Sequence, residues 1–298
     1  MPDLSSDMRE IITAPGCYDI PTARYHEDPC PEPSLSCSIA KILLNASPLH
    51  AAAKHPRLAK HPIRTDKAIF DLGKAAHKLL LGKGEPLVIV KADSWRTKAA
   101  REARDAARLA GKTPLLQHQF ENTVRMAEAC RAQLAEHMEG DLLASGKGEQ
   151  ALIWREGDVW CRSLIDWMPE VIEEGAVFID YKSTAASAHP SLWAMRTGAA
   201  IGFDFQRAFY GRGISQVFKV KNFRFIFIVQ ENFAPYTISI IEIDAPTVRA
   251  AMRHVKTAVG IWRSCLRSNS WPGYPDETIR VAPPSRITRD PHTLLEDG

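Results

Sequence analysis

The chain lacks the features that mark several common protein classes. Its 298 residues include only 6 cysteines, and no Cys-x-x-Cys pair occurs, which excludes zinc ribbons and thioredoxin-like motifs. It has no glycine-rich phosphate loop and no internal repeat. The cysteines are scattered along the chain: Cys17, Cys30, Cys37, Cys130, Cys161 and Cys265. Because a cytosolic chain keeps its thiols reduced, we expect free cysteines, several of them buried.

Long apolar runs and strong charge are also missing. No run reaches the roughly 18 apolar residues of a membrane span, and Met1–Asp7 lacks the pattern of a targeting signal. We therefore expect a cytoplasmic protein without a membrane partner. The net charge of +3 and the pI near 8.5 are mildly basic, so any contact with nucleic acid must come from local patches.

Hydrophobic periodicity predicts helices and strands in mixed order. Helices are expected at 38–44, 68–81, 115–137, 190–209 and 246–268, and strands at 86–90, 151–156, 159–166, 176–182, 223–230 and 236–243. This order predicts an α/β or α+β fold, a central mixed β-sheet flanked by helices, with a helical N-terminal portion. We expect an extended N-terminal arm at 1–33, a single domain at 34–275 and an irregular C-terminal tail at 276–298.

Two predicted strands end in charged residues. Asp166 ends one strand, and Asp180 and Lys182 end the next. Side chains alternate faces along a strand, so Asp180 and Lys182 share a face while Tyr181 points the other way. If the strands pair, two carboxylates and an ammonium group meet, an arrangement that is unfavourable to desolvate unless a cation joins it. An exposed ion pair on a strand face is the simpler alternative.

Further residues could join this group. His77 lies one turn after Gly73 on the predicted helix at 68–81, and Glu149 precedes the first strand of the sheet. Gln206 and Tyr210 are spaced to share one helix face. Taken singly, each also fits an ordinary structural role: a partly buried histidine, a solvated glutamate, an amphipathic helix.

Hydroxyl and basic residues offer candidate phosphate contacts. Ser183 and Thr184 directly follow Lys182 and could bind phosphate or form a turn. Basic residues gather in Lys54–Lys67 and in Arg96–Lys112. Such clusters contact nucleic acid in some proteins and are solvated loops or helix faces in many others.

The order Gly-x-x-x-His, Glu, Asp, Asp-x-Lys, Gln-x-x-x-Tyr resembles the PD-(D/E)xK nuclease superfamily. Within it, the chain is similar to the RecE-type (exonuclease VIII-like) and RecB-type branch, to which lambda exonuclease is related. Three further stretches resemble RecE-type chains: Leu35–Lys41 with Ser47-Pro48, Arg96-Thr97-Lys98 with Ala110-Gly111-Lys112, and Ile179–Thr184. The chain departs from that group at Tyr181, where an apolar residue is usual, and at Ser183, where threonine is usual.

This resemblance implies a restriction-endonuclease-like core and specific roles. Asp166, Asp180 and the Tyr181 carbonyl would bind Mg²⁺ or Mn²⁺, with His77 as a further ligand or phosphate contact and Glu149 serving a second ion. Lys182 would orient the attacking water. Gln206 and Tyr210 would position the strand being cut. No iron–sulfur cluster is expected, because only Cys265 lies downstream of these motifs.

The resemblance also implies an activity and an assembly. We expect a DNA exonuclease acting at double-stranded ends, 5′ to 3′, in recombination or repair of the phage type, with a single-strand annealing recombinase as a candidate partner. Arg96, Lys98, Ser183 and Thr184 would contact DNA. A homo-oligomeric ring would place Lys54–Lys67 and Arg96–Arg108 along a central passage. A structure-specific or restriction-type endonuclease, a non-catalytic DNA-end binding module and a monomer remain alternatives.

Overall fold

A mixed β-sheet forms the centre of the computed structural model, which describes residues 11–59, 71–138 and 140–281. Within these residues the sheet has seven strands: β1 (Gly16–Tyr18), β2 (Leu35–Ser36), β5 (Lys147–Glu156), β6 (Val159–Met168), β7 (Val177–Thr184), β8 (Arg224–Glu231) and β9 (Ile238–Glu242). The order is β1-β5-β6-β7-β8-β9, with β2 pairing with β6. Pairs are antiparallel except β7–β8 and β2–β6.

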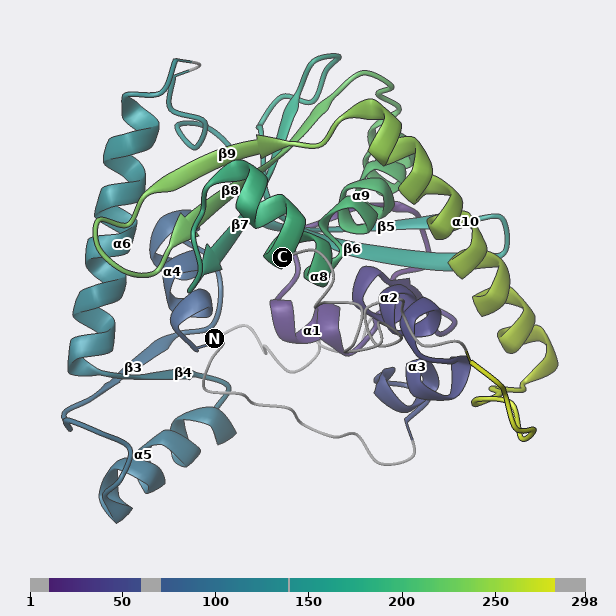
Figure 1. The fold of residues 1–298 in the computed structure, drawn as a ribbon, viewed down its shortest axis with the longest axis horizontal. Helices are drawn as coiled ribbons and strands as arrows, with labels where there is room; N and C mark the ends of the chain where they lie inside the picture. The colour runs from purple at the N-terminus through teal and green to yellow at the C-terminus, as the bar shows by residue number, and fades with distance from the viewer. Residues whose placement is uncertain (1–10, 60–70, 139, 282–298) are drawn as a thin grey trace, which may run out of the picture.

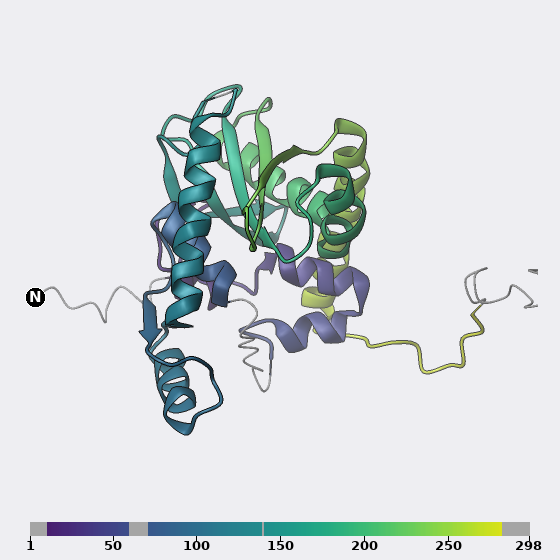
Figure 2. The ribbon, with the colours of Figure 1, turned by 60° about the vertical axis from the view of Figure 1, so that its left-hand side comes forward.

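Helices cover both faces of this sheet (Figures 1 and 2). On one side lie α4 (Asp71–Leu81) and α6 (Gln117–Ala135), and on the other α9 (Phe203–Phe218) and α10 (Ala245–Ser268). Next to α10 are α2 (Cys37–Asn45), capped by the Ser36 side chain, and α3 (Pro48–Lys54). The predicted mixed sheet flanked by helices, with a helical N-terminal portion, is therefore confirmed.

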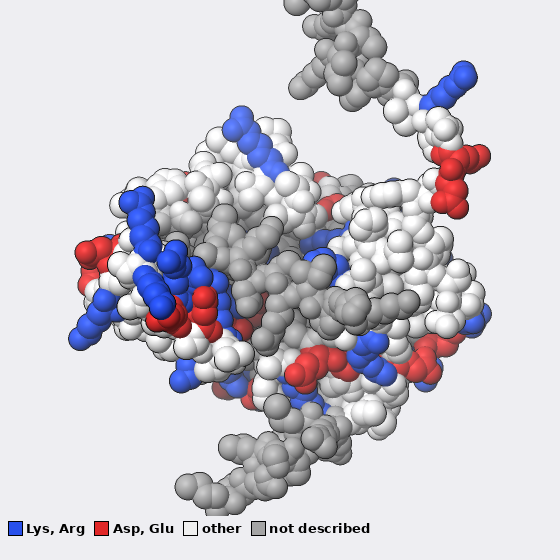
Figure 3. Space-filling model, turned by 90° about the horizontal axis from the view of Figure 1, so that it is seen from below, with Lys and Arg blue, Asp and Glu red and all other residues white. Residues whose placement is uncertain are grey.

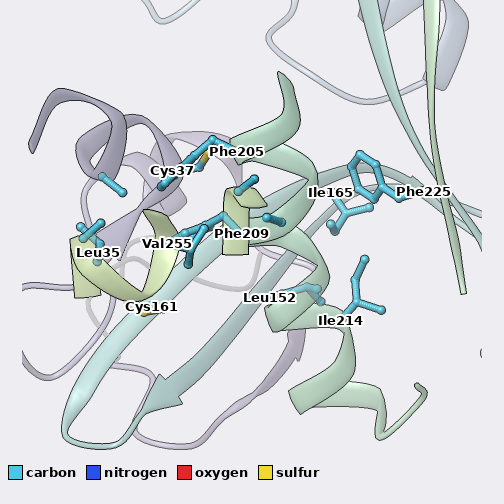
Figure 4. Close-up of a cluster of buried hydrophobic side chains, with 14 of the residues drawn as sticks. Leu35, Cys37, Leu152, Cys161, Ile165, Phe205, Phe209, Ile214, Phe225 and Val255 are labelled. Atoms are coloured by element: carbon cyan, nitrogen blue, oxygen red, sulfur yellow. The ribbon is translucent and has the colours of Figure 1, made fainter. Parts of the chain in front are cut away.

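The alternation of side chains along β7 places its residues in the two larger of the hydrophobic cores found in the described residues. Phe178 and Phe225 pack with α9 and α10 in the larger core, part of which is drawn in Figure 4. Ile179 and Tyr181, on the opposite face of β7, pack with α4 and α6. Neighbouring residues of β7 thus face different environments.

A small unit lies beside the main sheet. It consists of β3 (Leu87–Val90), β4 (Thr113–Leu116) and α5 (Lys98–Leu109), with β3 and β4 parallel. In Figure 1 it extends from the lower left of the molecule. The strand predicted at 86–90 is confirmed, but β4 was not expected, since its residues Leu115 and Leu116 had been assigned to the following helix. That helix, α6, begins at Gln117.

The single helix predicted at 190–209 is wrong. The segment instead forms α7 (Pro190–Trp193), a π-helical stretch (Ala194–Gly198), α8 (Ala199–Ile201) and then α9. The break falls at Gly202, whose φ of 63° lies in the left-handed region that glycine tolerates. Beyond the predicted end, α9 continues through Gly213, where a Cβ atom would come within 2.8 Å of the Trp154 ring. Close packing, not chain termination, explains that glycine.

Within the predicted extended arm, residues 16–18 and 22–26 form regular secondary structure. These residues form β1, which pairs with β5, and α1 (Thr22–His26). Residues 1–10 and 282–298, parts of the predicted arm and tail, lie outside the described residues, and the division at 34–275 stays a prediction. Five of the six cysteines are buried. No helix in the described ranges is long and apolar enough to cross a membrane.

A buried ionic network joins this N-terminal segment to β6. The fully buried Asp28 carboxylate lies 3.1 Å from Arg162 Nη1 and 3.2 Å from His55 Nε2, and it accepts hydrogen bonds from the Ser34 backbone and hydroxyl. Burial alone would raise the pKa of Asp28, but the His55 and Ser34 hydrogen bonds and the Arg162 charge outweigh it, so the pKa is lowered. The network therefore stabilises the fold only while Asp28 is ionised.

We predict that Asp28→Asn lowers the free energy of unfolding by about 3 kcal/mol at neutral pH, because it leaves the buried Arg162 guanidinium without its carboxylate partner. Since the folded pKa lies below the unfolded value of about 3.9, wild type should lose this contribution as the pH falls through both values. The difference between wild type and variant should then shrink in urea unfolding curves at acidic pH. Glu242→Gln, in the exposed pair with Arg224, is the control and should change stability by less than about 1 kcal/mol. A neutral-pH effect of Asp28→Asn equal to the control would contradict the prediction.

Candidate active site

Three neighbouring strands bring three carboxylates together. Glu149 lies on β5, Asp166 on β6 and Asp180 on β7. The antiparallel β5–β6 register pairs the residues on both sides of Glu149 with those on both sides of Asp166. The β6–β7 register then places Asp166 beside Asp180. The pairing on which the sequence interpretation depended is therefore present.

Asp180 is the most buried of the three, with 1% of its surface exposed. Lys182 Nζ donates a hydrogen bond to its Oδ1, and Gln206 Nε2 donates one to its Oδ2. Burial and the neighbouring charge of Asp166 raise the pKa of Asp180 to about 6, against the opposing effect of Lys182. Burial would lower the pKa of Lys182, but Asp180 and Asp166 outweigh it and raise the pKa, so Lys182 is an ammonium ion here.

His77, on α4, connects the other two carboxylates. Its Nε2 lies 3.4 Å from Asp166 Oδ1, and its Nδ1 lies 3.4 Å from Glu149 Oε1. Burial would lower the pKa of His77, yet Asp166 and Glu149 raise it overall. Asp166 also accepts a hydrogen bond from the Tyr181 backbone N–H at 2.9 Å. Although burial acts to raise the pKa of Asp166, the effects of His77 and Lys182 lower it.

The Tyr181 side chain faces away from the site, as strand alternation predicted. Its hydroxyl donates to Gln230 Oε1 at 2.7 Å in the core beneath α6. Ser183 lies on the same face of β7 as Tyr181, against α4, and lines a cavity there: a Cβ atom on Gly73 would lie 3.1 Å from its Oγ. This close approach explains the glycine at the start of the Gly-x-x-x-His motif.

Three of the proposed DNA contacts lie away from the cluster. Thr184 is buried, and its hydroxyl accepts a hydrogen bond from the Ala186 N–H, which is the turn-forming alternative. Arg96 and Lys98 are exposed near the beginning of α5 and line neither cavity at the carboxylates. Tyr210, by contrast, lines a cavity together with Asp166 and Gln206.

Two cavities adjoin the carboxylates and share several lining residues. The α2 cavity, of about 390 Å³, includes Asp166, Gln206 and Tyr210, and the α4 cavity, of about 620 Å³, includes Glu149 and Lys182. Four residues line both cavities: His26, Lys41, Leu164 and Gln206. They therefore form adjoining parts of one candidate site.

The sequence interpretation missed residues from the N-terminal portion. Tyr25, His26 and Lys41 line the α2 cavity, and Thr22 donates to Glu149 Oε2 at 2.6 Å. No spacing motif marks the α1 residues Thr22, Tyr25 and His26, because α1 follows a strand, β1, that joins the sheet by pairing with the distant β5. The hydroxyl-rich beginning of α2, at Ser36 and Ser38, was the one available signal.

The donor set suits a hard divalent cation by its chemistry. Asp180 is buried and the adjacent Asp166 is partly buried; burial first, and then the charge of Asp166, raises the pKa of Asp180. In the described part of the chain, no three His, Cys, Asp or Glu side chains already surround a common point at which an ion could bind. The carboxylate oxygens are instead engaged by Lys182, Gln206, His77 and the Tyr181 N–H.

Comparison with known families agrees with this arrangement. Residues 36–280 match the model of a family described as a PDDEXK-like domain of unknown function (DUF3799). The chain belongs to this family. Its central mixed sheet flanked by helices is consistent with the predicted restriction-endonuclease-like core, and the superfamily prediction is confirmed. None of the curated proteins matches the chain.

The chain also resembles solved structures. The crystal structure of a putative exonuclease from Eubacterium rectale matches 94% of this PDDEXK-like chain and 99% of its own, with 11% identity and a TM-score of 0.54. At that identity the likeness shows a shared fold. The crystal structure of SSO0001 matches 65% of this chain and 85% of its own, with 12% identity and a TM-score of 0.28. The RecE-type subgroup stays a prediction.

Because Tyr181 and Lys182 lie on opposite faces of β7, we predict that a substitution at Tyr181 lowers stability and that one at Lys182 lowers turnover. Tyr181→Phe leaves buried Gln230 Oε1 without its donor and should lower the free energy of unfolding by about 1–3 kcal/mol, with site chemistry retained. Lys182→Ala should remove most turnover, and Lys182→Arg should not restore it fully, because a planar, delocalised guanidinium group does not reproduce the compact charge of the ammonium group. Urea unfolding and a nuclease assay on the same preparations measure both effects. Wild-type turnover in Lys182→Ala would eliminate the assigned role of Lys182.

Proposed function

We propose that this protein is a metal-dependent deoxyribonuclease of the RecE type, which hydrolyses phosphodiester bonds at double-stranded DNA ends in the 5′ to 3′ direction. The observation that carries the proposal is the meeting of Glu149, Asp166 and Asp180 on three adjacent strands, with Lys182 against Asp180. Membership of the PDDEXK-like family supports it. A module without chemistry has no need for such a buried cluster of charges.

The residues present define what the site could do. Asp166, Asp180 and the Tyr181 carbonyl would hold Mg²⁺ or Mn²⁺, with His77 and Glu149 as further candidate ligands. Such an ion lowers the pKa of bound water and neutralises charge on the phosphoryl oxygens. Lys182, an ammonium ion in this structure, would orient the attacking water and stabilise developing negative charge. Gln206 holds Asp180, while Tyr210 lines the neighbouring cavity, where the strand being cut would lie.

Basic side chains away from the carboxylates, on α5, would bind DNA beyond the cleavage site. Seen from below in Figure 3, Lys and Arg side chains gather on the left of the molecule, over α5. Arg96, Lys98 and Arg101 are exposed there. Of Lys54–Lys67, residues 60–67 lie outside the described residues; Lys54 lines the α2 cavity. His55 is fully buried, so it cannot face a DNA passage, and Arg57 donates to the Cys30 and Pro31 carbonyls.

Substrate topology separates the proposal from its alternatives. We would incubate the full chain with linear and with closed-circular duplex DNA, each with Mg²⁺, Mn²⁺ or EDTA. Degradation of linear DNA alone, stopped by EDTA, supports an exonuclease. Cutting of circular DNA indicates an endonuclease, and binding without cleavage indicates a DNA-end binding module. End-labelled strands then report polarity.

Asp180→Asn should lower cleavage by about 100-fold or more while DNA binding persists, because the substitution keeps the side-chain volume but removes the charge. The remote, exposed Asp158, paired with Arg263 and Arg267, gives a matched control in Asp158→Asn, which should retain activity. Gel-based cleavage and binding assays on both variants test this. Full activity of Asp180→Asn would rule out the proposed site.

We further propose that several copies assemble into a ring, a tetramer by the RecE resemblance. A single chain with net charge +3 has little non-specific attraction for phosphates, whereas several copies could line one passage with Arg96–Arg108. Light scattering at micromolar concentration should give a multiple of the chain mass of 33.2 kDa. The mass of one chain, with and without DNA, would refute the ring. A single-strand annealing recombinase remains the candidate partner and should co-purify with the assembled protein.

A further inference from the structure

The segment that precedes the matched family region places a hydroxyl on the acidic cluster. Thr22, the first residue of α1, donates from Oγ1 to Glu149 Oε2 at 2.6 Å. The family match begins only at residue 36. A hydrogen bond this short between a neutral donor and a carboxylate is of the charge-assisted kind. The contact therefore brings a side chain from outside the matched region directly onto a candidate metal ligand.

Glu149 needs support from its surroundings. Its φ of 49° lies in the left-handed region, which is unfavourable for a residue with a side chain and rare within a strand such as β5. Backbone of this kind persists where neighbouring groups fix it, and it gathers at functional sites. Three neighbours surround the carboxylate: Thr22 at Oε2, His77 at 3.4 Å from Oε1, and Gly84, where a Cβ atom would also lie 3.4 Å from Oε1.

The donor itself is held by the sheet. β1 pairs with β5 through Tyr18↔Ala151, two residues from Glu149 along the strand. Between β1 and α1, Asp19 forms an ion pair with Lys83 at 2.9 Å. Thr22 is half-buried beside the α4 cavity, which it lines together with Glu149 and Lys182. Its hydroxyl is thus fixed relative to the strand that carries its acceptor.

We propose that Thr22 is a positioning residue, which orients the Glu149 carboxylate, and through His77 that of Asp166, for divalent-cation binding. This inference rests on the proposed function. Groups that hydrogen-bond metal-binding carboxylates orient them and set their affinity for the ion. A hydroxyl does so as a neutral donor, so it adds no positive charge that would compete with a cation.

Mn²⁺ titration of the full-length protein by calorimetry tests this. Thr22→Val, which removes the hydroxyl and keeps the branched shape, should weaken Mn²⁺ binding about 10-fold. Thr22→Ser should retain wild-type affinity. Thr257→Val is the matched control, because the Thr257 hydroxyl is exposed on α10 and donates to the Arg253 carbonyl. Melting curves establish that each variant is folded; if Thr22→Val is not, Thr22→Ala compared with Thr22→Ser decides the question.

A double-variant cycle separates positioning from a general effect on the fold. In a Glu149→Gln background, Thr22→Val should produce no further loss of Mn²⁺ affinity, because the acceptor charge is already gone. Equal losses in both backgrounds would overturn the inference, as would wild-type affinity in Thr22→Val. If wild type binds no Mn²⁺ at all, the proposed function fails and this inference fails with it. If wild type binds Mn²⁺ and cleaves DNA, and Thr22→Val binds Mn²⁺ equally well, only the proposed role of Thr22 is contradicted.

Discussion

The organisation of this site depends on the burial of Asp180 beside a second carboxylate, Asp166. Asp180 is almost fully buried, and its raised pKa shows that both burial and the second carboxylate oppose its ionisation. Lys182 and Gln206 supply the donors that make its charge tolerable. A well-packed apolar group would stabilise the same position at least as well. The cluster is therefore better explained by chemistry than by stability.

The pairing of three strands places the acidic residues side by side. Because β5, β6 and β7 are consecutive antiparallel neighbours, one acidic residue on each strand is enough to form a row. Alternation along β7 then separates two tasks. Asp180 and Lys182 face the site, whereas Ile179 and Tyr181 complete the core under α4 and α6. One face of β7 thus packs in the hydrophobic core, and the other face carries the charged groups of the site.

The sequence revealed the parts of the site that depend on local periodicity. Alternation placed Asp180 and Lys182 on one face, and helical spacing placed Gln206 and Tyr210 together, both of which line the α2 cavity. What it could not reveal depends on contacts between distant segments. Thr22 reaches Glu149 across 127 positions, and no local pattern encodes that approach. Gly202 and Gly213 look alike in sequence, yet one breaks a helix and the other allows Trp154 to pack against one.

Two side-chain contacts join the N-terminal segment to the strands that carry the site, an ion pair and a hydrogen bond. Asp28 binds Arg162 on β6, four residues before Asp166 on the same strand, and Thr22 binds Glu149 on β5. Arg162 also lines the α2 cavity, and its guanidinium lies over the Tyr25 ring at 5.6 Å. The buried Asp28 network therefore contacts β6 close to Asp166, at a residue that itself lines the cavity beside Asp166. Residues 16–34 thus contact two of the three strands that carry the candidate site, although the segment precedes the matched family region.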